Sequence, residues 1–175
     1  MSILHSTKRQ AGQNLVEFAI LLPILALMIF GVAEIGNALN AYIGVTNAAR
    51  EGARLASRGA IYSGAQVMQV IESQTQYLDL NAHGSVVMTV VKSDTSGFVG
   101  PPVVTQLLGT APSRFSSSSL AALHQQAIAT ANQSYLSKER FVVIEVFYDC
   151  PTLTRYLWSS IPMYSYTVMK ISAAS

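Results

Sequence analysis

Hydrophobic positions are distributed unevenly along this chain of 175 residues. The segment from Phe18 to Ala33 contains no charged residue, and neither does the segment from Ile35 to Ala49. The remainder mixes shorter apolar runs with stretches rich in Ser, Gly and Pro, as an ordinary small domain does. The pattern therefore predicts an apolar N-terminal anchor followed by a polar body.

The apolar region is expected to form one helix from Leu15 to about Gly59. Between these residues there is no turn signal, although Pro23 removes one backbone hydrogen bond and can kink the helix. At about 1.5 Å per residue the helix would be roughly 65–70 Å long, whereas about 20 residues cross the hydrocarbon core of a bilayer. Only its first half can therefore lie in lipid.

The second half of this helix has two distinct faces. One face carries small and apolar residues, namely Val45, Ala49, Gly52, Ala56 and Ala60. Another face carries Arg50, Arg54 and Arg58. This arrangement predicts a helix that packs against a folded body along its small-residue face.

The body is expected to mix helices and strands. Helices are predicted over 64–78, where Val67, Val70, Ile71 and Leu78 share one face, and over about 120–133. Runs rich in β-branched residues predict strands over 85–92, 140–150 and from 164 or 165 to 171, with Pro151 ending the second. Residues 94–119 are interpreted as a long loop.

These elements predict an α+β fold. A long N-terminal transmembrane helix continues into a small domain with an antiparallel sheet of about three strands and two short helices. The expected organisation is a leader over 1–12, a stem helix over 13–60 and the α+β domain over 61–175.

Charge adds an orientation to this picture. Charged residues make up 11% of the chain and hydrophobic residues 50%, which is far fewer charges than soluble proteins usually carry. Lys8 and Arg9 precede the apolar run, so the N-terminus is expected to be cytoplasmic and the body exported. The three arginines of the stem are too few to indicate a nucleic-acid surface.

Candidate chemistry is sparse. The three histidines, His5, His83 and His124, are scattered without the spacing of a metal site, and no nucleophile motif or phosphate loop is present. No enzyme activity, cofactor or metal is therefore expected. Cys150 is the only cysteine, so no intramolecular disulfide is possible, and burial as a small hydrophobic residue is favoured over pairing between chains.

Glu17 is the unusual residue of the apolar segment. A carboxylate in hydrocarbon costs at least a few kcal/mol and is usually functional when it occurs there. An ordinary secretory signal would have a cleavage site after its apolar core, but here the polar-to-apolar junction lies before it, at Gly12–Gln13. Taken alone, Glu17 is equally compatible with an anchor residue that reaches the headgroups.

Two separated motifs resemble the TadE-like minor pseudopilins of the tight-adherence (Tad) pilus. The first, "GQNLVEF", spans Gly12 to Phe18, and the second, "NAAREGAR", spans Asn47 to Arg54. The C-terminal stretch "FVVIEVFYDCPTL…YSYTVMK" is similar, more weakly, to the family's closing pair of strands.

The resemblance implies a processing and assembly route. A prepilin peptidase would cut between Gly12 and Gln13, and Glu17, then the fifth residue, would pair with the N-terminal amine of a neighbouring subunit, with Phe18 beside it. Packing of the stem helix would involve Asn47, Arg50, Glu51 and Arg54.

The partners that the resemblance implies are the peptidase, other Tad pilins and pseudopilins, the inner-membrane assembly platform and membrane lipid. Adhesion and biofilm formation follow from the family alone. The alternative is a stably anchored periplasmic binding or scaffold protein that never enters a filament. A major pilin is disfavoured, because the chain is much longer than a stem helix.

Overall fold

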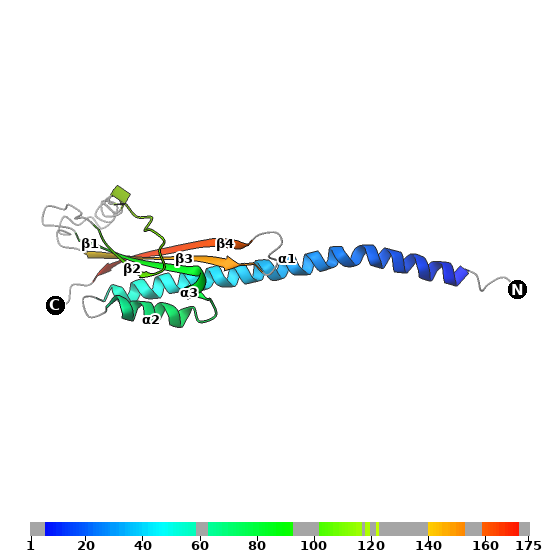
Figure 1. Ribbon diagram of the computed structural model, residues 1–175, viewed down its shortest axis with the longest axis horizontal. Helices are drawn as coiled ribbons and strands as arrows, with labels where there is room; N and C mark the ends of the chain where they lie inside the picture. The colour runs from blue at the N-terminus through cyan, green and yellow to red at the C-terminus, as the bar shows by residue number, and fades with distance from the viewer. Residues whose placement is uncertain are drawn as a thin grey trace.

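The computed structural model describes residues 6–58, 63–92, 102–116, 118–119, 122, 140–152 and 159–171. The longest element is α1 (Ser6–Ala56), a helix of 51 residues. Its N-terminal part projects alone from the body, while its C-terminal part runs through the body (Figure 1). The other helices are α2 (Gly64–Gln74) and α3 (Leu80–His83), and the strands are β1 (Gly84–Lys92), β2 (Val103–Leu108), β3 (Arg140–Pro151) and β4 (Ser160–Ile171).

The four strands form one antiparallel sheet in the order β2-β1-β3-β4. Residues with β-branched and aromatic side chains fill the two central strands, β1 and β3, which suits a pleated and buried surface. β4 is an edge strand, which explains why it accommodates Pro162 opposite Asp149 without breaking the ladder.

The core lies between the sheet, the C-terminal part of α1 and α2. Alternate residues of β3, Val142, Ile144 and Val146, join Ala48 and Ala49 of α1 in one buried cluster. A Cβ atom built on Gly52 would lie 2.9 Å from Cδ1 of Ile71 in α2 and 3.5 Å from Cγ2 of Ile144 in β3. The helix is therefore enclosed between α2 and the sheet (Figure 1).

The predicted α+β architecture is confirmed, with a long apolar helix followed by an antiparallel sheet and short helices. The helix begins earlier than expected, at Ser6 instead of Leu15, and it ends at Ala56. The second predicted helix ends at Gln74, four residues before Leu78. The helix expected over 120–133 lies outside the described residues except for Ala122, which is helical.

The sheet has four strands, so the expectation of about three is wrong. The additional strand, Val103–Leu108, lies within the segment that was interpreted as a loop. Its short apolar run follows a Gly-Pro-Pro sequence, which masked the strand pattern, and pairing with β1 stabilises it. The other three predicted strands occur, and β3 ends at Pro151 as expected, whereas β4 begins at Ser160, earlier than the predicted 164 or 165.

Candidate functional site

The N-terminal half of α1 exposes its apolar side chains. Residues 13–36 are exposed almost throughout, with Leu15 71% and Ile29 69% accessible. Within the described residues, one helical stretch, Gln13–Ala56, is long and apolar enough to cross a membrane, and its most apolar window is not buried by the body. This long apolar helix indicates single-pass membrane anchoring.

Glu17 and Phe18 lie in this exposed half. Phe18 is 61% accessible, and Glu17 is exposed and has no polar partner among the described residues. The backbone is helical through Gly12 and Gln13, so the candidate cleavage site lies inside the continuous helix. The residues predicted for processing and assembly thus all lie in α1, and their roles stay predictions.

The C-terminal half of α1 presents small residues to the body. Val45, Ala49 and Ala53 are fully buried, and Gly52 is buried beside them. The predicted small-residue face is therefore the packed face. Ala60, the last member of the predicted stripe, lies outside the described residues.

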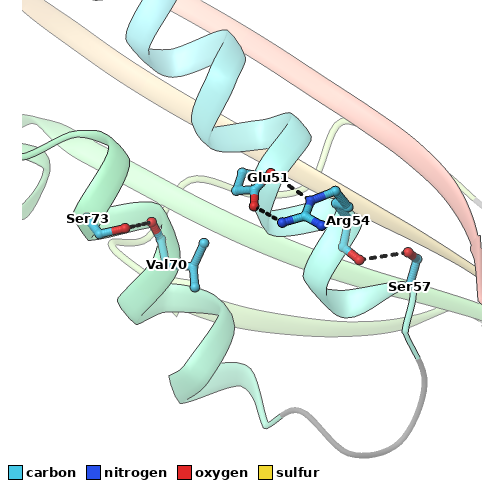
Figure 2. A network of polar contacts seen from close by, with 5 residues as sticks. All are labelled: Glu51, Arg54, Ser57, Val70 and Ser73. Carbon is cyan, nitrogen blue, oxygen red and sulfur yellow. Dashed lines mark hydrogen bonds and ion pairs between the residues drawn. The ribbon is translucent and has the colours of Figure 1, made fainter.

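The polar residues of the second motif lie on the opposite side. Asn47 and Arg50 are exposed. Arg54 Nε donates to Glu51 Oε2 over 2.8 Å, and a second contact joins Arg54 Nη2 to Glu51 Oε1 (Figure 2). The hydrogen bond from Arg54 is the main cause that lowers the pKa of Glu51. Asn47, Arg50 and Arg54 are exposed and Glu51 is partly buried, and the role of these four residues in packing stays a prediction.

A polar contact joins α1 to the end of β3 where the helix enters the body. Asn37 Nδ2 lies 3.6 Å from the sulfur of Cys150 and 3.5 Å from the carbonyl oxygen of Pro151. Cys150 is buried, as the sequence favours, and burial is the larger cause that raises its pKa, followed by the nearby charge of Glu34. This contact attaches the apolar helix to the base of the sheet.

The residue that sequence reasoning missed is Glu145, in the middle of β3. Its side chain is fully buried on the face of the sheet away from α1. It accepts hydrogen bonds from the backbone N–H of Arg114 and from the hydroxyl of Tyr164, each over 2.9 Å, and from the hydroxyl of Ser113. Glu145 therefore attaches the segment around residue 114 to the outer face of the sheet.

Aromatic contacts surround this carboxylate. The guanidinium carbon of Arg114 lies 4.2 Å from the ring centroid of Tyr164 and 5.4 Å from that of Phe147. Burial, followed by the hydrogen bond to Glu145, raises the pKa of Tyr164. A single charged residue inside the run "FVVIEVF" was the available signal, because a lone carboxylate in a central strand needs partners.

This cluster has the features of a structural site. Its groups satisfy one another, and the described residues contain no group of three or more His, Cys, Asp or Glu side chains that could hold a metal ion. The element available for interaction is the exposed half of α1.

Comparison with known proteins gives a match within α1, the helix that carries the exposed apolar half. Curated proteins gave no significant match. Residues 12–54 match the family model described as TadE-like protein, which covers the candidate processing site, Glu17 and both sequence motifs. This match indicates a Tad pilus-associated protein and an association with other pilus components in general. The chain is therefore TadE-like over residues 12–54, as the resemblance of its two motifs predicted.

Proposed function

We propose that the protein is a minor pseudopilin, a structural subunit of a Tad-type pilus or secretion filament. The observation that carries this proposal is the exposed half of α1, which presents an apolar surface and, within the TadE-like segment, a carboxylate that has no polar partner among the described residues. A buried carboxylate is tolerable when it is paired and hydrogen-bonded. The amine of a neighbouring subunit would supply that pairing for Glu17 on assembly.

In the proposed route the chain is inserted with Lys8 and Arg9 on the cytoplasmic side and the body outside the inner membrane. A prepilin peptidase then cuts between Gly12 and Gln13. Because α1 is helical at this site, cleavage requires its first turns to unwind. Gly12 assists, because glycine is among the weakest helix formers. Cleavage also removes both basic residues, which eases extraction of the helix from the bilayer.

The test is the intact mass and N-terminal sequence of the chain recovered from native membranes, with and without prepilin peptidase. A chain that starts at Gln13 only in the presence of the peptidase supports the proposal. A chain that retains residues 1–12 in both strains contradicts it and leaves the stably anchored scaffold protein.

A second measurement examines assembly. Glu17→Ala and Glu17→Gln should each abolish recovery of the subunit with pilus components while leaving its level in the membrane unchanged. Leu27→Met is the matched control, because it keeps an exposed apolar side chain in the same half of α1 and lies outside both motifs. Normal assembly of both Glu17 variants would contradict the proposed pairing.

A further inference from the structure

We propose that the base of the body rests on the outer surface of the membrane, where an apolar groove takes up lipid acyl chains. This proposal depends on the insertion of α1 described under the proposed function. The groove, of about 600 Å³, lies where α1 enters the body. Ile35, Leu39 and Tyr42 of α1 form one wall, and Ile161 and Pro162 at the start of β4 form the other.

The length of the exposed apolar surface supports this placement. Large hydrophobic side chains are exposed along α1 from Leu15 to Ile43, and none beyond Ile43 is exposed in its described part. This distance is roughly 42 Å at the rise of an α-helix. The hydrocarbon core is about 30 Å thick, and roughly 40–45 Å with the headgroups. The apolar surface therefore extends through the outer headgroup layer, and its last part forms the wall of the groove.

Two exposed tyrosines, one on α1 and one beyond the end of α2, lie at about the same height along the axis of α1. Tyr42 is 52% exposed on the helix, and Tyr77, beyond the end of α2, is 55% exposed. The hydroxyl of Tyr77 donates to the carbonyl oxygen of Asn40 over 3.4 Å, beside Gly44. Tyrosine is enriched at membrane–water interfaces, where its ring contacts lipid and its hydroxyl remains hydrated.

Among the described residues at the base, charge favours apolar contact over attraction to anionic headgroups. The described segments at this level, 34–49, 72–84, 148–152 and 159–164, contain no Lys or Arg. They do contain four acidic residues, which anionic headgroups repel, namely Glu34, Glu72, Asp79 and Asp149. Lipid is favoured over a second copy as the occupant, because the groove continues the apolar surface that surrounding lipid already covers in the proposed insertion. The contact should therefore form with zwitterionic lipid and be insensitive to salt.

The experiment places one nitroxide label at a time on the full-length protein in phosphatidylcholine vesicles. Collisions with oxygen, which concentrates in lipid, are compared with collisions with a water-soluble nickel chelate. The labels are attached through Pro162→Cys at the groove, Leu25→Cys in the exposed half of α1, and Val104→Cys on the exposed surface of β2. The background is Cys150→Ser, with Cys150→Ala as a second background if the first does not fold by circular dichroism.

Oxygen should be the stronger relaxant at Leu25→Cys and Pro162→Cys, and the nickel chelate at Val104→Cys, at low and high salt alike. A label at Pro162→Cys that behaves like Val104→Cys overturns the inference while leaving membrane insertion intact. Weak relaxation by both reagents, with spin–spin broadening that dilution by unlabelled protein removes, identifies a second copy as occupant and also overturns it. Preference for nickel at Leu25→Cys instead contradicts insertion itself.

Discussion

The exposed N-terminal half of α1 differs in its side chains and its surroundings from the C-terminal half, which packs inside the body. Between Gln13 and Gly36 most side chains are apolar, many of them large, and they have little protein around them. From Ala41 to Ala53 the buried positions are small, and α2 and the sheet approach closely. The surroundings decide what each half needs, because lipid or neighbouring subunits accommodate bulk, whereas close packing of elements requires small residues.

The carboxylates of the two regions show the same contrast. Glu17 is exposed on the bare helix and has no polar partner in the described part of the chain. Glu145 is completely buried in the body, where three donors from its own chain surround it. Folding satisfies the carboxylate of Glu145, whereas in the proposed function the carboxylate of Glu17 is paired only on assembly. Substitution of Glu145 should therefore change the stability of the body, whereas substitution of Glu17 should change assembly and leave that stability nearly unchanged.

Removal of the buried carboxylate should have the largest effect on stability. Glu145→Ala removes three part-buried hydrogen bonds to a charged group, each of which contributes about 1.5–3 kcal/mol, so the free energy of unfolding should fall by about 3 kcal/mol or more. Glu145→Gln, which keeps an acceptor oxygen, should cost less. Denaturant unfolding in detergent micelles, followed by circular dichroism, measures both.

Glu17→Ala, in the exposed half of α1, is the variant to compare with Glu145→Ala. It should change the free energy of unfolding of the body by no more than about 0.5 kcal/mol. Equal losses for Glu17→Ala and Glu145→Ala would remove the distinction between the two carboxylates.

The next largest effect is expected where a larger side chain replaces a glycine of α1, and it should differ between the two halves of the helix. At Gly52 a new side chain meets the buried Ile71, so Gly52→Leu should destabilise the body by about 1–3 kcal/mol. At Gly36 no atom lies within 4 Å of a built Cβ, so Gly36→Leu should be neutral for the body in the same unfolding experiment. Destabilisation by Gly36→Leu would show that the bare half also packs against the body.

Alkaline pH should destabilise the body, because Tyr164 and Cys150 lose their protons more easily in the unfolded chain than in the folded protein. The pKa of Tyr164 is raised above its ordinary value of 10.0, so the unfolded chain loses this proton first. The stabilisation is complete below about pH 10 and is lost as pH rises through the folded pKa. Tyr164→Phe should weaken the decline above pH 10. A weaker decline from about pH 9 should remain, because the pKa of Cys150 is raised as well.

Unfolding of Tyr164→Phe and of the parent protein between pH 7 and 11 makes this comparison. At neutral pH the variant should lose about 1.5–3 kcal/mol, the contribution of a hydrogen bond to a charged group. An unchanged pH profile would mean that Tyr164 ionises as freely in the folded protein as in the unfolded chain.

The smallest effect is expected for the exposed ion pair of the stem. Arg54→Ala should lower stability only slightly and mainly at low salt, because surface ion pairs contribute little. The lowered pKa of Glu51 means that this small contribution is present above pH 4.5 and is lost as pH falls through the folded pKa. A thermal scan at low and high salt tests this, and a large loss at high salt would indicate that Arg54 has a packing role.

Much of this architecture follows from local patterns. The uncharged segments predict the long apolar helix, and the run of β-branched residues from 140 to 150 predicts a strand. The spacing of Ala49 and Gly52 predicts the packed face of the stem. These features depend on the periods of helices and strands, which can be recognised in the order of apolar and polar residues along the sequence.

Tertiary structure alone decided the features that join distant residues. β2 is a strand because β1 offers it hydrogen bonds, although its six residues carry little signal of their own. Glu145 became a structural carboxylate only when Ser113, Arg114 and Tyr164 were brought to it across the sheet. Chain-distant hydrogen bonds and close contacts have no period in the sequence, so their partners emerge only once the elements are packed together.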